Sequence, residues 1–329
     1  MPQKPIWITE NEVVELISLP EAIEALERIL PLEVSDKAAS MPKTHLMVDK
    51  NDAMHAIGGA VSGIGYCGFK TWINIQGRSE TTLTLFSLEN AACLAVIEAT
   101  ALGQMRTAAM TGVGTKRLAP AEADSMAIVG TGKQSLPQIA AVHAVRPLNE
   151  VRVWSRNPET RESFAHQVTK SLRIPTYSMD SLDAATKDSP LVTLITNSTK
   201  PFLDADILAK NSHLNAMGAI IPARMEFSEN IFKRVDLAVV DSLKTVRELS
   251  AEFRNHYGEA DDLWKEVTTI ASIIKEDRMR PLNADVTLFK AMGMGLSDLA
   301  LGIEIFDRAK AKNKGTPLPI RKKFSPRLI

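Results

Sequence analysis

The first thirty residues combine helix-start signals with apolar positions at helical spacing. Thr9 and Ser18 each stand three residues before a glutamate, Glu12 and Glu21, which is the capping-box pattern at a helix N-terminus. The apolar positions that follow are Ala22, Ile23, Leu26, Ile29 and Leu30. A spacing of three and four residues is typical of an amphipathic helix. The pattern predicts helices that begin near residues 9 and 18.

From residue 53 onward the chain consists of short apolar or β-branched segments separated by glycines. The predicted strands are 53–61, 66–74, 81–89 and 93–99. Gly63, Gly65 and Gly77 lie between them, where turns are expected. These segments predict an antiparallel meander. A helix over about 100–118 is expected to follow it.

After residue 125 strand-like and helical segments alternate. The predicted strands are 126–130, 151–155, 191–196, 213–218 and 236–241. The first four are almost continuously apolar, as are strands that are covered on both faces. The alternation predicts an α/β fold with a doubly wound parallel sheet of the Rossmann type. Residues 286–312 are expected to form one long helical segment, apolar at first and basic toward its end.

Composition narrows the function classes. The 39 basic residues equal the 39 acidic ones, so there is no basic excess to attract nucleic acid or a membrane surface. No apolar run approaches the roughly 20 residues of a membrane span. The two cysteines form no C-x-x-C pair, and the histidines show no metal-ligand spacing. With no secretory signal at the N-terminus, we expect a metal-free cytoplasmic protein.

A glycine-rich turn directly follows the predicted strand 126–130. The residues expected to bind a cofactor here are Gly130, Thr131, Gly132, Lys133 and Gln134. Glycines let the backbone approach a pyrophosphate, and the N-terminus of the next helix offers N–H groups to it. Ser135 replaces the third glycine of G-x-G-x-x-G, and its small side chain still permits close packing. An ordinary glycine turn is the alternative.

The predicted strand 151–155 ends at Ser155, and Arg156 follows it. Enzymes that prefer NAD usually have Asp or Glu here, bonded to the ribose 2′-hydroxyl. A carboxylate would repel a 2′-phosphate, whereas serine and arginine would bind it. We therefore expect NADPH to be preferred and NADH to be possible. The alternative is that Arg156 is a solvated surface charge.

Four motifs together resemble the ornithine cyclodeaminase/μ-crystallin family. In chain order they are GFK at 68–70, MRTAA at 105–109, GTGKQ at 130–134 and LFKAMGMGLSDLALG at 288–302. Each motif alone is modest, and the ordered set is specific. The resemblance covers nearly the whole chain. Its members include cyclodeaminases, alanine dehydrogenases and reductases of cyclic ketimines, so it implies a nicotinamide-dependent oxidoreductase.

The resemblance also implies a domain organisation. Residues 1–118 and 305–329 would form a discontinuous α+β domain that binds a small imino or amino acid and forms a homodimer. Residues 119–304 would form the Rossmann domain that binds NAD(P).

Three basic residues match family positions that meet the substrate. Lys43 and Arg106 match residues that hold the substrate carboxylate, and Lys70 matches the active-site lysine. An arginine can hold a carboxylate through two hydrogen bonds. Lys70 follows an apolar strand segment, so partial burial could make it a proton donor. The alternatives are an ion-paired Arg106 and a lysine that merely reaches solvent from a strand end.

Two further residues are expected to contribute to cofactor binding. Thr107, in the family motif around Arg106, matches a residue that bonds a cofactor phosphate. Asp298 falls in the last motif and is expected to help shape the nicotinamide pocket, with a helix-cap role as the alternative.

One departure from the family pattern bears on the reaction. Cyclodeaminases carry an aspartate after the strand that corresponds to 213–218, where this chain has Ile220. That aspartate serves as an acid–base group, and such groups contribute about 10²–10⁴-fold to a rate. We therefore expect reduction of 1-pyrroline-2-carboxylate to proline, and also of 1-piperideine-2-carboxylate to pipecolate. The alternatives are an ornithine cyclodeaminase, an alanine dehydrogenase and a μ-crystallin-like carrier that binds NADP and a ligand.

Overall fold

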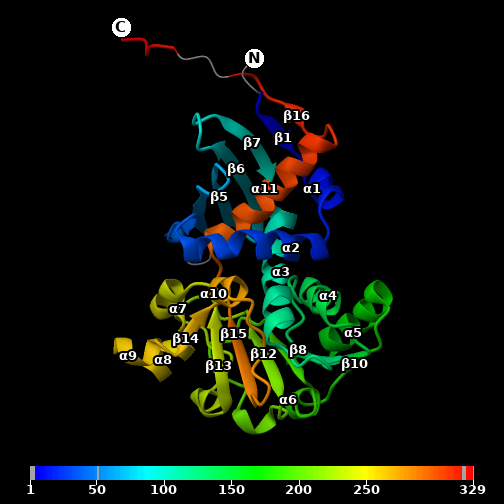
Figure 1. Ribbon diagram of the computed structural model, residues 1–329. Coiled ribbons are helices and arrows are strands. Elements are labelled where there is room, and N and C mark those ends of the chain that lie inside the picture. Colours follow the sequence, from blue (N-terminus) through cyan, green and yellow to red (C-terminus); the bar gives the residue numbers. More distant parts are fainter. Residues whose placement is uncertain (1–3, 50–51, 321–323, 329) are drawn as a thin grey trace.

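The computed structural model describes residues 4–49, 52–320 and 324–328. Two β-sheets form the centres of two domains, which lie one above the other in Figure 1. The α/β class and the parallel sheet expected from the sequence are both confirmed.

The N-terminal helices begin where the capping boxes predict. α1 spans Glu10–Leu16 and α2 spans Leu19–Ile29, and a 3-10 turn, Leu30–Ser35, follows. Both capping boxes are formed. The apolar face of α2 is buried, which is how a short amphipathic helix is stabilised in a protein.

The first sheet contains the predicted meander. Its strands are β1 (Ile6–Ile8), β2 (Ala39–Ser40), β3 (Thr44–Met47), β4 (Ala53–Val61), β5 (Tyr66–Ile75), β6 (Arg78–Ser87), β7 (Cys93–Glu98) and β16 (Thr316–Pro317). β4, β5, β6 and β7 pair antiparallel in chain order, and β1 pairs parallel with β7. The predicted strand ends differ by a few residues at most.

The helix α3, Thr100–Leu118, joins the two domains and matches its predicted range. It packs against α2 of the first domain and against β12 and β15 of the second. Its middle third is therefore placed at the junction, where MRTAA lies.

The second sheet is parallel throughout, in the order β10-β9-β8-β11-β12-β15-β13-β14. Its strands are β8 (Ser125–Val129), β9 (Glu150–Trp154), β10 (Thr176–Ser178), β11 (Leu191–Leu194), β12 (Ser212–Ala216), β13 (Val235–Val240), β14 (Val267–Thr269) and β15 (Val286–Lys290). The helices that follow them are α4 (Ser135–Val145), α5 (Pro158–Leu172), α6 (Leu182–Thr186), α7 (Leu243–Leu249), α8 (Ala251–Tyr257), α9 (Asp261–Trp264) and α10 (Ile270–Lys275). Two 3-10 turns span Ala205–Ile207 and Glu229–Arg234. From β8 the sheet extends one way through β9 to β10, and from β11 it extends the other way to β14. The order of the strands therefore reverses between β8 and β11, and ligands bind at this point in such folds.

The expectation of one helical segment over 286–312 is wrong in its first part. Val286–Lys290 is the fully buried strand β15, and the helix α11 begins only at Gly295 and ends at Ala311. A short buried strand and a buried helix turn show the same unbroken run of apolar residues, so periodicity does not separate them.

The predicted domain boundary at 305 also needs correction. α11 contacts β4, β5 and α2 of the first domain, so the helix belongs to that domain from its start. In Figure 1 it crosses the first sheet diagonally. The chain therefore returns to the first domain in the stretch between β15 and α11, about ten residues earlier than expected from sequence.

Within the described residues, no helix has the length and apolar character of a membrane span, and no cluster of three potential metal ligands occurs. The buried apolar side chains form three clusters. One fills the first domain and reaches Phe289 and Val239, and the other two include alternating strand positions of the parallel sheet. The first of these clusters therefore extends through α3 from the first sheet to the parallel sheet.

Candidate active site

A cleft of about 470 Å³ lies where the two domains meet. Its walls come from both domains: β5, β6 and α3 on one side, and the strand ends of the parallel sheet on the other. The lining residues used below are Lys70, Trp72, Arg106, Thr107, Gly132, Lys133, Gln134, Thr196, Gly218, Ile220 and Gly293.

Lys70 is a buried cation on β5. Alternation along the strand exposes Phe69 and Thr71 and turns Lys70 toward the interior, where it is 5% exposed. Burial lowers its pKa from 10.5 to about 8, against the opposing effect of the nearby Asp298 carboxylate. An ammonium group with this pKa can give up its proton near neutral pH.

Asp298 pairs with both Lys70 and Arg106, which the sequence analysis predicted as separate site residues. Its Oδ1 accepts from Lys70 Nζ at 2.6 Å and from Arg106 Nε at 3.0 Å. The two cations hold the pKa of Asp298 below its usual value despite complete burial. Within the described residues its Oδ2 has no hydrogen-bond partner.

Asp298 is 1% exposed and is not among the lining residues of the cleft. It contacts Lys70 and Arg106 and therefore positions these two cations, while its part in shaping a nicotinamide pocket stays a prediction. The start of α11 can reach this place because Gly295 packs on β4. A Cβ at Gly295 would lie only 1.9 Å from the Gly58 carbonyl oxygen.

Lys43, between β2 and β3, approaches the same group from the edge of the sheet. Its Nζ lies 5.5 Å from the centre of the Trp72 ring, and Lys70 Nζ lies 5.0 Å from that ring. Burial and the nearby Arg106 lower the pKa of Lys43. All three cations of the sequence prediction are thus brought together, and Trp72, which the sequence reasoning missed, packs against two of them.

The cation group carries more positive than negative charge. Lys70 and Arg106 share the Asp298 carboxylate, and Lys43 lies near enough for its pKa to feel the same charge. The buried Asp241 also lies within electrostatic range of Arg106. Buried charges are costly unless they are paired. A small anion in the cleft would supply the missing negative charge, and Arg106 offers its guanidinium to it.

The glycine turn forms the opposite wall. Gly130 has φ +116°, and a Cβ there would lie 2.5 Å from the Ile195 carbonyl oxygen, so only glycine fits. Beside Gly132 a Cβ would meet nothing within 4 Å, which leaves room for a ligand against the backbone. α4 begins at Ser135, and Ser135 is fully buried.

These features fit a dinucleotide pyrophosphate. Gly132, Lys133 and Gln134 line the cleft at the N-terminus of α4, where backbone N–H groups and the positive end of the helix dipole favour an anion. Thr131 lies in the same turn but not among the lining residues.

The remaining predicted cofactor residues lie on either side of the turn. Thr107 lines the cleft, but its hydroxyl donates to the Gly103 carbonyl of its own helix at 2.9 Å. Ser155 and Arg156 follow β9, whose last residue, Trp154, accepts a hydrogen bond from Gly130 N. They lie beside the turn and outside the cleft lining.

A third segment of the wall was missed by the sequence reasoning. Gly293, with φ +91°, follows β15 and lies against Arg106, whose Nη1 would be 3.2 Å from a Cβ at that position. The buried Asp241 holds this segment by accepting from the Met292 and Gly293 amides at 2.9 and 2.7 Å. In the sequence, the two glycines at 293 and 295 are the feature that could have indicated this wall segment.

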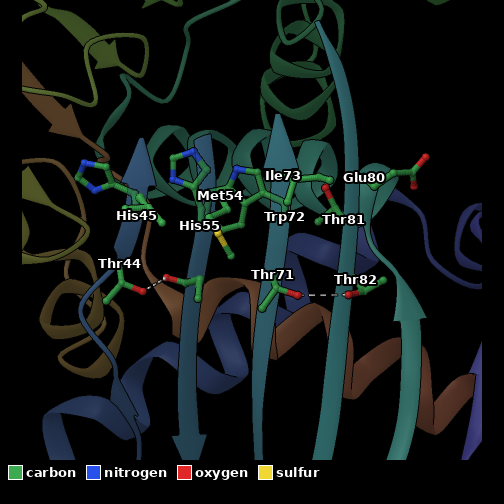
Figure 2. A pocket seen from close by; sticks show the side chains of 12 residues that line it. Thr44, His45, Met54, His55, Thr71, Trp72, Ile73, Glu80, Thr81 and Thr82 are labelled. Atoms are coloured by element: carbon green, nitrogen blue, oxygen red, sulfur yellow. Dashed lines mark hydrogen bonds between the residues drawn. The ribbon is translucent and has the colours of Figure 1, made fainter. Parts of the chain in front are cut away.

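A separate groove lies over β3, β4, β5 and β6 of the first sheet (Figure 2). In this view Thr71 and Thr82 lie side by side on the neighbouring strands β5 and β6, bonded at 3.3 Å, and Thr44 on β3 donates to the Ala56 carbonyl of β4. The groove shares Trp72 and Thr81 with the cleft. The exposed apolar side chains on these strands include Leu46, Met54, Phe69 and Ile73.

Two relatives and one solved structure are similar to the chain over most of its length. The alanine dehydrogenase of Archaeoglobus fulgidus is 27% identical over 322 residues, 94% of this chain and 97% of that protein. The Delta(1)-pyrroline-2-carboxylate reductase of Bacillus cereus is 28% identical over 68% of this chain and 69% of its own. The Delta(1)-pyrroline-2-carboxylate reductase of Thermococcus litoralis, solved with NADH and L-proline, has the same fold, with a TM-score of 0.87 at 24% identity over 95% of this chain and 100% of that one.

The family resemblance drawn from four short motifs is confirmed by a match along almost the whole chain. The model of the ornithine cyclodeaminase/mu-crystallin family matches residues 3–313, which include both sides of the cleft. The cation group and the glycine turn both lie within that match. This chain therefore belongs to the ornithine cyclodeaminase/mu-crystallin family.

Proposed function

We propose that this protein reduces a cyclic ketimine, 1-pyrroline-2-carboxylate, to L-proline with NADPH. The enzyme class is that of its relatives: a nicotinamide-dependent oxidoreductase that acts on carbon–nitrogen bonds. The six-membered 1-piperideine-2-carboxylate, which would give L-pipecolate, is the second expected substrate.

The observation that carries the proposal is the buried cation group facing a glycine turn across one cleft. Arg106 and Lys43 would bind the substrate carboxylate, and this would orient the C=N bond toward the opposite wall. The nicotinamide, when bound, supplies a hydride. Lys70, buried and shared with Asp298, would give a proton to the imine nitrogen, so that the amine forms as C2 accepts the hydride.

Ile220 favours reduction over ornithine cyclisation. Its side chain lines the cleft, in the place where the family resemblance puts the cyclodeaminase aspartate. An alkyl side chain cannot exchange the protons that ammonia loss requires, whereas a preformed ketimine needs only one proton donor. The same reasoning makes a linear amino-acid dehydrogenase the second candidate, since the carboxylate-binding residues would serve both.

A substrate panel tests this function. NADPH oxidation should be rapid with 1-pyrroline-2-carboxylate, slower or comparable with 1-piperideine-2-carboxylate, and weak with pyruvate plus ammonia. Ornithine should release little ammonia. Robust proline formation from ornithine would overturn the proposal. A chain that binds NADPH but turns over none of these compounds would instead be a carrier.

The pH dependence should follow Lys70. A proton donor must be protonated, and the fraction of protonated Lys70 falls as pH rises through its pKa of about 8. The kcat of ketimine reduction should therefore decline above pH 8, while proline oxidation, which needs the neutral amine, should rise through the same range. Initial rates in both directions from pH 6 to 10 check this. A reduction rate that is flat to pH 10 would exclude Lys70 as the donor.

The proposed preference for NADPH depends on the two residues that follow β9. Ser155 and Arg156 follow the strand, and the first carboxylate after them is Glu159, inside α5. Arg156→Ala should raise the KM for NADPH about tenfold, the worth of one charge-assisted hydrogen bond. The KM for NADH, which has no 2′-phosphate, serves as the internal control and should stay unchanged. An equal loss with both cofactors would contradict this assignment.

A homodimer would cover the apolar outer face of the first sheet. Leu46, Met54, Phe69 and Ile73 are each at least two-fifths exposed there, beside the groove of Figure 2. Contiguous apolar patches on a protein surface mark association sites. Phe69→Glu together with Ile73→Glu should convert a dimer into a monomer in sedimentation experiments. A wild-type monomer at micromolar concentration would contradict the dimer.

A further inference from the structure

Glu226 is a fully buried carboxylate just behind the cleft, and its two carboxylate oxygens accept hydrogen bonds from segments of the cleft wall. Its Oε1 accepts from the Thr196 amide at 2.7 Å and from the Thr196 hydroxyl at 2.8 Å. Its Oε2 accepts from the Gly218 and Ala219 amides at 2.9 and 3.0 Å. One side chain thus satisfies four donors.

These donors belong to two neighbouring strand ends. Thr196 follows β11 and Gly218 follows β12, and both residues line the cleft. The two segments are so close that a Cβ at Gly218 would lie 2.3 Å from the backbone nitrogen and oxygen of Thr196. Glu226 therefore holds the end of β11 against the end of β12.

A buried partner supports the negative charge. Lys290, at the end of β15, is fully buried, and its Nζ lies 3.4 Å from Glu252 Oε2. Glu252 Oε1 in turn accepts from the Glu226 amide at 3.1 Å. Burial raises the pKa of Glu226, and the charge of Lys290 and the donors oppose that rise. Four donors aimed at two oxygens require the ionised carboxylate, since a carboxyl proton would meet one of them.

The position in the sheet indicates which half of the cofactor this wall meets. Ser155 and Arg156 follow β9 and the glycine turn follows β8, whereas Thr196 and Gly218 lie on the other side of the turn, toward β15 and Gly293. Gly293 touches Arg106. The segments that Glu226 holds are therefore on the side of the cation group, where the reacting end would lie.

We infer that Glu226 is a positioning residue that fixes the nicotinamide-facing wall of the cleft through the Thr196 and Gly218 backbone. This inference rests on the proposed dinucleotide function. It concerns a residue outside the lining of the cleft, which would act on the reaction only through the two segments that it joins.

The substitution Glu226→Gln tests this inference, because it removes the charge and changes the shape of the side chain very little. Whichever way the amide turns, its NH₂ group faces two donors, so two hydrogen bonds are lost and replaced by repulsion. Each lost bond in a buried site costs about tenfold in an equilibrium. Calorimetry should show that the Kd for NADPH rises at least about tenfold, while the Kd for 2′-phospho-ADP-ribose, which lacks the nicotinamide, changes less than about twofold.

Two further variants sharpen the test. Glu226→Asp keeps the charge but is too short to reach all four donors, so its loss should be intermediate, and it replaces the glutamine variant if that chain does not fold. Glu162→Gln, an exposed position on α5, should bind both ligands like the wild type. Unchanged NADPH binding in Glu226→Gln, or an equal loss for both ligands, would overturn the inference. A wild-type chain that binds neither ligand would overturn the proposed function itself.

Discussion

Lys70→Met should reduce the kcat of ketimine reduction by about 10²–10⁴-fold, the usual contribution of a general acid. Methionine fills most of the space of the lysine chain but offers no proton, and Arg106 still pairs with Asp298. Binding of NADPH should persist, because the glycine turn lies on the opposite wall. Steady-state kinetics and calorimetry on the same preparation measure the two effects separately.

The matched control is Lys170→Met, an exposed lysine on α5. It should leave both the rate and cofactor binding unchanged. A Lys70→Met enzyme with a kcat within threefold of the wild type would mean that water or another group protonates the imine. In Lys70→Met the decline in the kcat of ketimine reduction above pH 8 should disappear, because the ammonium group that titrates there has been removed.

Asp298→Asn should have the largest effect on stability. It leaves Lys70 and Arg106 buried beside each other without their shared counter-charge. Removing one partner of a buried ion pair typically costs about 3–5 kcal/mol in the free energy of unfolding. Because Asp298 raises the pKa of Lys70, its loss should also move the decline in reduction rate to a pH below 8.

Urea unfolding and the pH–rate profile check the two effects of Asp298→Asn independently. Asp188→Asn, at an exposed position, provides the control for the chemical change alone and should alter neither. If Asp298→Asn kept wild-type stability and an unmoved pH profile, Asp298 could not be the residue that holds the two cations.

Several features of the fold follow from local pattern. The capping boxes at Thr9 and Ser18 and the helix over 100–118 depend on short-range chemistry, which tertiary contacts did not override. The glycine turn is also local, because the conformation of Gly130 is set by the turn that joins β8 to α4. These elements could be predicted within a few residues.

Other features depend on packing between distant segments. β15 could not be separated from a helix, because a strand buried on both faces has no alternating pattern to recognise. The place where the chain returns to the first domain depends on Gly295 meeting Gly58, a contact between residues far apart in sequence. The same contact places the start of α11 where Asp298 can pair with Lys70 and Arg106.

The sequence by itself determined the parallel sheet and the glycine turn after β8, since each depends on residue types and spacings within a short window. The three cations were predicted from the family resemblance. Only the tertiary structure decided that Lys70 and Arg106 share one carboxylate, with Lys43 nearby, and that Glu226 joins two strand ends. Those arrangements depend on how β5, α3 and α11 cross at the domain junction, and that crossing is set by side-chain packing that no local pattern contains.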